Sequence, residues 1–215
     1  MSNPTSKVGV CNLALDLLKE KPISDIDTPT TDVESLCARQ YDIVRTALLQ
    51  SRNWSFATKS EAISRGGTPS VSIYADYYTL PNDYLKLLAI NDPNQPLTRH
   101  AYHIESGKLL MDNNGASSLD IWFIYDFGTV ASFPPLFTEL LAWRLALQLG
   151  YKITAKPSVI AEIKKGLVLA EREALAFNGQ ERPPTRYENS KIVNAGLTPA
   201  SKQQVAGDYE FDFVP

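Results

Sequence analysis

The feature that most constrains the fold is the stretch from residue 133 to residue 149, which is apolar on nearly every side. Two prolines at its start suit a first helical turn, where a missing backbone N–H costs nothing. The Leu- and Ala-rich run behind them favours helix. Only Glu139, Arg144 and Gln148 interrupt the apolar run, which is too short and too charged for a comfortable membrane span. Such a helix must be covered on most sides, by its own chain or by a neighbouring subunit.

Two further helices are expected before this stretch. Apolar residues recur at helical spacing between residues 6 and 19. A capping box of Thr31 and Glu34 opens a second helix, which runs to about Gln50. The expected buried stripe of the second helix consists of Cys37, Tyr41, Val44 and Leu48. Its wetter sides are expected to carry Glu34, Arg39, Asp42 and Arg45.

Strand signals replace the helical pattern between residues 54 and 127. The expected strands span residues 55–63, 72–80, 85–90, 98–104, 108–111 and 119–125. Short strands at this rhythm predict a small antiparallel sheet or a partial barrel.

A fourth helix is expected after the apolar stretch. Pro157 suits its first turn and Gly179 suits its end. Its apolar seam alternates steps of four and three residues through Val159, Ile163, Leu167, Ala170, Ala174 and Phe177.

The last segment of the chain has a different composition. From residue 180 onward Gly, Pro, Ser, Lys and Gln dominate, so the segment cannot offset its own ordering entropy. It ends in a strict alternation in which Tyr209, Phe211 and Phe213 are separated by acidic residues. This alternation predicts a strand edge that docks on a sheet or groove of another chain; the alternative is a loose terminus with chance aromatics. Together with Arg186 and Tyr187, these aromatics are the expected partner-binding residues.

The order of these elements predicts an α+β fold. We expect a four-helix bundle with an inserted small antiparallel β-sheet or partial barrel, followed by an extended C-terminal arm. The expected divisions are a helical hairpin over residues 1–54, the β region over 55–130, a second hairpin over 131–179 and the arm over 180–215.

The bulk composition indicates a globular, soluble protein. The apolar fraction is 44% and the net charge is -3, which provides no broad basic surface for general binding to nucleic acid. Cys11 and Cys37 are expected to be reduced and buried. The first residues lack the basic region and apolar core of a signal peptide, so synthesis in a cytoplasm is expected.

Candidate acids and metal ligands are few. His100 and His103 would face opposite sides of a strand, so no metal site and no cofactor are expected. Asp112 and Asp120 flank a turn and could serve as the acid and base of a glycosidase, although aspartates that solvate turns are far commoner.

Two other residue groups have both a functional and a structural interpretation. Cys11 could act as a nucleophile, but a cysteine in an apolar stripe is usually inert packing. Arg52, Trp54 and Phe56 could stack nucleic-acid bases, but large aromatics more often anchor a core. We therefore expect no enzyme activity.

Several short motifs occur in an order that resembles a known family. They are Cys11-Asn12-Leu13-Ala14-Leu15, then Tyr41 with Arg45, then Arg52-Asn53-Trp54-Ser55-Phe56-Ala57, then Tyr78-Thr79-Leu80-Pro81-Asn82-Asp83-Tyr84-Leu85, and finally the 133–149 stretch. Over residues 8–178 the chain resembles the head–tail adaptor proteins of short-tailed phages, the tail tubular protein A-like connectors.

This resemblance implies a structural virion protein rather than an enzyme. Members of the family form a homo-oligomeric ring, usually twelve-fold, between the portal protein of the capsid and the tail nozzle or tail tube protein. DNA passes through the ring without sequence-specific binding, and no membrane is involved. The rival interpretations are a glycan hydrolase-like tail enzyme, which would need Asp112 or Asp120, and a DNA-binding module, which the acidic charge balance disfavours.

Overall fold

The computed structural model describes residues 3–94, 97, 100–154 and 156–181. Its helices are α1 (Lys7–Leu17), α2 (Asp32–Ser51), α3 (Pro135–Ile153) and α4 (Pro157–Gln180), with short 3-10 turns η1 (Ser55–Ala57) and η3 (Val130–Ser132). Its strands are β1 (Thr58–Gly67), β2 (Asp76–Thr79), β3 (Tyr84–Ile90), β4 (Tyr102–Glu105), β5 (Lys108–Met111) and β6 (Ser118–Tyr125). A strand lies within or overlaps each of the six expected ranges, but β1 begins only at Thr58, after η1, and β2 and β4 are shorter than expected. Residues 98 and 99 of the fourth expected strand lie outside the described residues.

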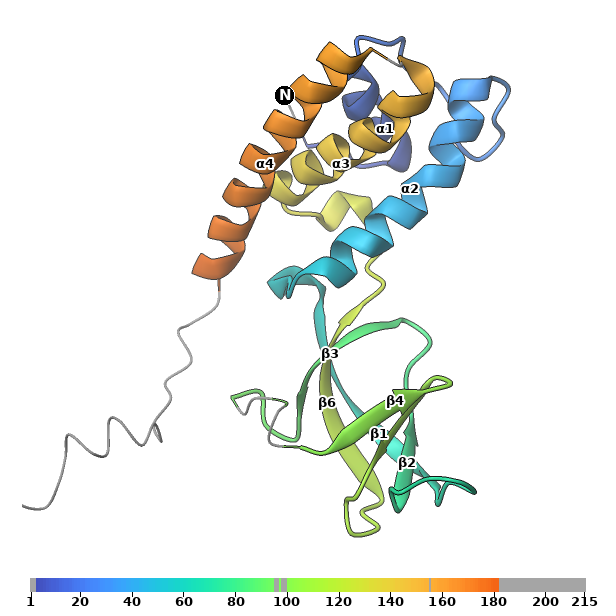
Figure 1. The fold of residues 1–215 in the computed structure, drawn as a ribbon, viewed down its shortest axis with the longest axis vertical. Helices are drawn as coiled ribbons and strands as arrows, with labels where there is room; N and C mark the ends of the chain where they lie inside the picture. The colour runs from blue at the N-terminus through green and yellow to red at the C-terminus, as the bar shows by residue number, and fades with distance from the viewer. Residues whose placement is uncertain (1–2, 95–96, 98–99, 155, 182–215) are drawn as a thin grey trace, which may run out of the picture. The chain divides into compact units, whose positions relative to one another are not determined.

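Helix α3 is the hub of the helical part, as Figure 1 shows. It packs against α1, α2 and α4, whereas those three helices have few contacts with one another. Its buried residues lie on nearly all sides of its axis, and even one hydroxyl side chain, Thr138, is buried. The apolar faces of α3 are therefore largely covered by helices of the same chain.

The predicted four-helix bundle with a small inserted sheet is wrong. In a bundle, four helices share one core and each packs against its neighbours. Here a single helix takes the central position and the other three surround it, because one amphipathic stripe cannot cover a helix that is apolar all round.

The β region is also larger than a small insertion. It forms one six-stranded antiparallel sheet in the order β3-β6-β1-β2-β5-β4, which curls into a half-barrel. The curled sheet has its own apolar core: Ile63, Tyr78, Leu80, Leu87, Ile90, Leu109, Met111, Leu119, Ile121 and Phe123. Strands β3, β6, β1, β2 and β5 contribute buried residues to this core, so the sheet is stabilised in part independently of the helices.

Strand β1 allows the sheet to curl. Its first part pairs with β6 and its last residues pair with β2, with a break in register between Arg65 and Gly67. A Cβ on Gly66 would lie 2.1 Å from the ring of Tyr77, and Gly67 has a φ of 131°. Both glycines are needed here, because any side chain would collide with the ring or strain the backbone.

The start of α2 forms as its sequence predicts. Thr31 Oγ1 accepts from the Glu34 backbone N–H at 3.2 Å, and the Glu34 carboxylate accepts from the Thr31 backbone N–H at 3.0 Å. The same carboxylate accepts from the backbone N–H and the hydroxyl of Thr30, each at 2.9 Å. Glu34 is only 4% exposed, so the expectation that it lies on a wet side of the helix is wrong. It is a buried anchor for the α1–α2 loop.

A close approach between α3 and α4 yields one prediction. A Cβ on Gly166 would lie 2.3 Å from the indole of Trp143, so Gly166→Ala must displace this ring. We expect the free energy of unfolding to fall by about 1 to 3 kcal/mol in urea denaturation. Gly179→Ala is the matched control, because nothing lies within 4 Å of its added Cβ. Equal stability of the two variants would contradict this packing.

The Glu34 anchor yields a second prediction, on pH. Hydrogen bonds from the Thr30 backbone N–H and hydroxyl lower the pKa of Glu34 from 4.5 to about 2. Because the folded pKa is depressed, the stabilisation is present above about pH 4.5 and is lost as the pH falls toward about 2.

The test compares melting temperatures between about pH 2 and about pH 6. The difference between the wild type and Glu34→Gln should be largest near neutrality and should shrink in acid. Glu20→Gln, at an exposed position of the same loop, is the control. A difference that stays constant with pH would show that the carboxylate charge has no such role.

Candidate interaction surface

The motif residues of α1 and α2 fasten neighbouring elements. The side-chain amide of Asn12 makes two hydrogen bonds with the backbone of Ile23. Its Nδ2 donates to the Ile23 carbonyl at 3.1 Å, and its Oδ1 accepts from the Ile23 N–H at 2.8 Å. Tyr41 is 1% exposed, and its hydroxyl has no hydrogen-bond partner among the described residues. Burial raises the pKa of Tyr41 well above its usual range. These two residues therefore serve packing rather than chemistry.

Arg45 joins α2 to the end of the sheet. Its Nη1 donates to the Asp126 carboxylate at 2.5 Å and to the Phe127 carbonyl at 2.8 Å, just beyond β6. Arg45 is 6% exposed, so the expectation that it lies on a wet side of α2 is also wrong. An apolar side chain could pack here but could not donate to these two oxygens, whereas the guanidinium of Arg45 binds both and its Nε also donates to the Asp42 carboxylate at 3.4 Å.

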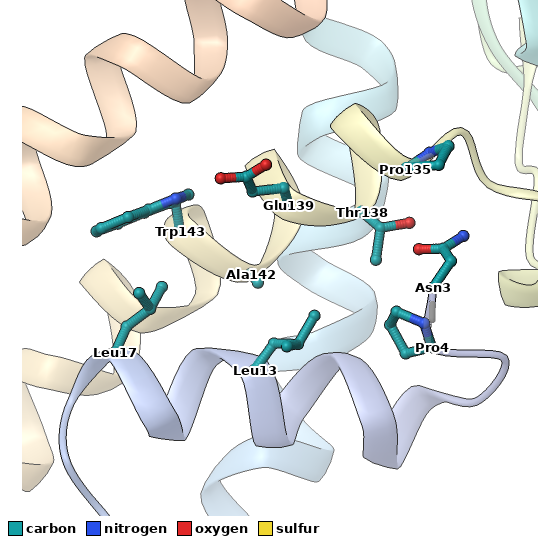
Figure 2. Close-up of a pocket in the computed structure, with 9 residues that line it drawn as sticks. All are labelled: Asn3, Pro4, Leu13, Leu17, Pro135, Thr138, Glu139, Ala142 and Trp143. Atoms are coloured by element: carbon teal, nitrogen blue, oxygen red, sulfur yellow. The ribbon is translucent and has the colours of Figure 1, made fainter. Parts of the chain in front are cut away.

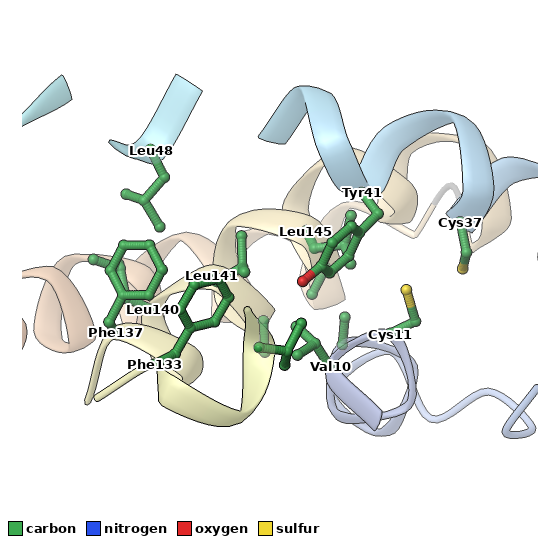
Figure 3. Close-up of a cluster of buried hydrophobic side chains, with 14 of the residues drawn as sticks. Val10, Cys11, Cys37, Tyr41, Leu48, Phe133, Phe137, Leu140, Leu141 and Leu145 are labelled. Atoms are coloured by element: carbon green, nitrogen blue, oxygen red, sulfur yellow. The ribbon is translucent and has the colours of Figure 1, made fainter. Parts of the chain in front are cut away.

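The aromatic motif after α2 anchors the core. Trp54 is 1% exposed, and its indole N–H donates to the Leu48 carbonyl at 2.9 Å. The Trp54 ring meets the ring of Phe137 of α3 edge-on, with centroids 5.0 Å apart, and the centroid of the Phe56 ring lies 4.7 Å from that of Phe137. Figure 3 shows Phe137 and Leu48 within this apolar cluster. The core-anchoring interpretation of Trp54 and Phe56 is therefore confirmed, and the base-stacking one is not supported.

The motif from Tyr78 to Leu85 hydrogen-bonds to the segments before and after β6. The Tyr78 hydroxyl donates to the Ala116 carbonyl at 2.9 Å, which fastens β2 to the loop before β6. The Asp83 carbonyl accepts from the Asp126 N–H at 2.7 Å. The motifs that resemble the adaptor family thus connect helix to loop, helix to sheet and strand to strand.

The candidate acids and metal ligands do not converge. Among the described residues no group of three His, Cys, Asp or Glu could hold a metal ion. His103 lies on β4 at 3.5 Å from Glu105, whereas His100 lies outside the strand. The Asp112 carboxylate accepts from the Ala75 N–H at 2.7 Å, which matches the turn-solvating interpretation.

The two cysteines face each other across α1 and α2, as Figure 3 shows. Both are free and fully buried. The hydrogen bond between the thiols, together with burial, raises the pKa of Cys11 well above its usual range. A thiol that stays protonated is a poor nucleophile, so Cys11 is packing, as its position in the apolar stripe predicts.

Exposed aliphatic side chains gather on three outer surfaces of the described residues. On α4, Val168 is 69% exposed and Leu169 is 56% exposed; on α2, Ile43 is 63% exposed. In the loop between β1 and β2, Val71 and Ile73 are about nine-tenths exposed. The sequence analysis did not predict these surfaces. Its signal for α4 was that Val168 and Leu169 are apolar but fall outside the apolar seam of the helix. The exposed aliphatics on α4 and in the β1–β2 loop occur as pairs, whereas Ile43 is a single exposed residue of a kind that is ordinary on protein surfaces.

A groove of about 400 Å³ lies between α1 and α3. Figure 2 shows Leu13 and Leu17 of α1 on one side, with Glu139 and Trp143 of α3 on the other. The lining is mainly apolar, and Glu139 has no ion-pair partner among the described residues. The groove has the character of a contact surface more than of a catalytic cleft, since it contains a single carboxylate.

The five partner-binding residues expected from the sequence, Arg186, Tyr187, Tyr209, Phe211 and Phe213, lie outside the described residues. No protein-family model matches the chain, and a search of curated proteins finds no match to its sequence. The resemblance to head–tail adaptors therefore depends on the motifs alone. No helix in the described ranges is long and apolar enough to cross a membrane.

Arg45 yields a third prediction. Arg45→Leu removes the partner of both Asp126 and the Phe127 carbonyl. The free energy of unfolding should fall by about 2 kcal/mol, less than for a fully buried ion pair because Asp126 is partly exposed. Chemical denaturation measures this loss. Arg52→Leu breaks a more exposed pair with Glu171 and should cost only about 0.5 kcal/mol. The helix-to-sheet role of Arg45 is refuted if the two variants are equally stable.

Proposed function

We propose that the protein is a structural adaptor of a short-tailed phage virion. Copies of the chain form a ring that joins the portal protein to the tail nozzle or tail tube protein. The ring forms part of the channel through which DNA passes without sequence-specific binding. The chain acts in the neck of the particle after synthesis in the host cytoplasm.

The observation that carries this proposal is the ordered set of motifs. Five stretches distributed over residues 8–178 have the residue types and the order of the adaptor family. In the structure their side chains serve as fasteners: Asn12 to the α1–α2 loop, Arg45 to the end of β6, and Trp54 to α3. Residues that together position helices against a sheet are what related adaptors would have in common, even where their surfaces differ.

The outer surfaces support assembly with other chains. The exposed aliphatics of α2 and α4 lie on helices that pack against α3 by other faces. Exposed aliphatics on two different helices of one molecule suit a head-to-tail contact, which closes a ring when the rotation between copies is right. Permanent interfaces of this type bury over about 2,000 Å² and are more apolar than transient ones.

The two rival functions lack a supporting observation. A glycan hydrolase would need Asp112 or Asp120 as acid or base; the Asp112 carboxylate accepts from the Ala75 backbone N–H, and Asp120 lies exposed on β6. For a DNA-binding module, the chain would need a basic surface, but its net charge is -3. A mildly acidic channel wall, by contrast, would let DNA slide without holding it.

The fourth prediction concerns assembly on the portal. The purified full-length chain is mixed with the portal rings of the same phage and examined by native mass spectrometry and negative-stain imaging. We expect a stoichiometric adaptor layer on one end of the portal, with as many copies as the portal has subunits or a simple ratio of them. A chain that binds neither portal nor nozzle protein would refute the proposal.

A variant pair tests which surface takes part. Val168→Glu places a charge on the exposed face of α4 and should reduce ring formation at least tenfold while leaving the melting temperature unchanged, because Val168 is 69% exposed. Glu162→Gln, also at an exposed position of α4, is the control and should assemble normally.

A further inference from the structure

A recess lies at the corner where α3 turns into α4. Its volume is about 390 Å³, and its lining is Tyr151, Pro157, Ile160, Ala161 and Lys164. Tyr151 is 57% exposed, which is unusual for a ring of this size unless something covers it. The floor is apolar, and Lys164 Nζ lies 5.9 Å from the centre of the Tyr151 ring.

The corner also carries positive charge that nothing near it neutralises. Lys152, Lys156 and Lys164 are exposed, and none of them has an ion-pair partner among the described residues. Lys7, Arg45 and Arg52 pair with carboxylates, whereas Arg39, Lys165 and Arg172 are likewise exposed with no ion-pair partner among the described residues. What distinguishes the corner is that its unpaired lysines belong to the recess lining or stand next to lining residues in the sequence. An apolar recess edged by free lysines suits a ligand that combines aromatic rings with carboxylates.

One segment of this chain has that combination. Residues 208–213 read Asp-Tyr-Glu-Phe-Asp-Phe, three aromatics alternating with three carboxylates. We propose that this segment of one copy binds the corner recess of a second copy. Its rings fill the apolar floor around Tyr151, and its carboxylates face Lys152, Lys156 and Lys164.

The length of the connecting chain permits this contact. Residues 182–208 can span at most about 90 Å. Every copy both offers a segment and presents a recess, so the contact can run head-to-tail and repeat around a ring. This inference deepens the proposed function by naming a contact between copies, and its test uses no portal protein, so either can fail without the other.

The test uses a labelled peptide of residues 206–215 and the full-length chain with Tyr209→Ser, Phe211→Ser and Phe213→Ser, whose own segment cannot compete. Fluorescence anisotropy should detect saturable binding. When Lys164→Glu is added to the triple serine variant, it should weaken binding of the peptide at least tenfold. A peptide with Asp212→Lys should recover most of that loss. Lys165→Glu, beside Lys164 but outside the recess lining, is the matched control and should change affinity less than threefold.

Self-association then distinguishes the second copy from other occupants. The wild-type chain should form larger species with increasing concentration in sedimentation velocity, and the triple serine variant should not. Absence of peptide binding, or binding that Lys164→Glu leaves unchanged, overturns the proposal. So does a wild-type chain that stays monomeric while excluding the peptide, since the segment would then occupy the recess of its own chain.

Discussion

The need to cover α3 on nearly every side governs the helical part of this protein. A helix with a single apolar stripe can be satisfied by one or two neighbours, but α3 buries residues around almost its whole circumference. Three helices therefore pack against it, and the chain brings them from both sides of the β region in sequence. The close contact of Gly166 with Trp143 shows how near α4 must approach to complete this cover.

Buried polar groups then fasten the elements that apolar packing only brings together. Apolar contacts are not directional, so they do not fix how a loop or a sheet meets a helix. Glu34 collects the donors of the α1–α2 loop, and Arg45 bridges α2 to the residues after β6. Each is surrounded by partners, which is why burial of its charge is tolerated. These hydrogen bonds make the junctions specific.

The residues that resemble functional ones in the sequence turn out to be structural, and the surfaces available to partners are elsewhere. Trp54, Cys11 and Asp112 each have a packing or hydrogen-bonding role. The exposed aliphatics of α4, the groove between α1 and α3 and the lysine-edged corner have no such role within the described residues. The described residues thus divide into an interior of packed and hydrogen-bonded side chains and outer surfaces with exposed apolar side chains.

The sequence by itself determined the elements, because their signals are local: helical spacing, the Thr31–Glu34 capping box, the prolines before α3 and α4, and the short strands between turns. It also indicated that residues 133–149 need cover on most sides. Only the tertiary structure decided that α3 is a hub and not one member of a bundle, and that six strands curl around a core of their own. It also decided that Glu34 and Arg45 are buried. These outcomes depend on which distant partner each side chain meets, such as Asp126 for Arg45, and no periodicity within one element contains that information.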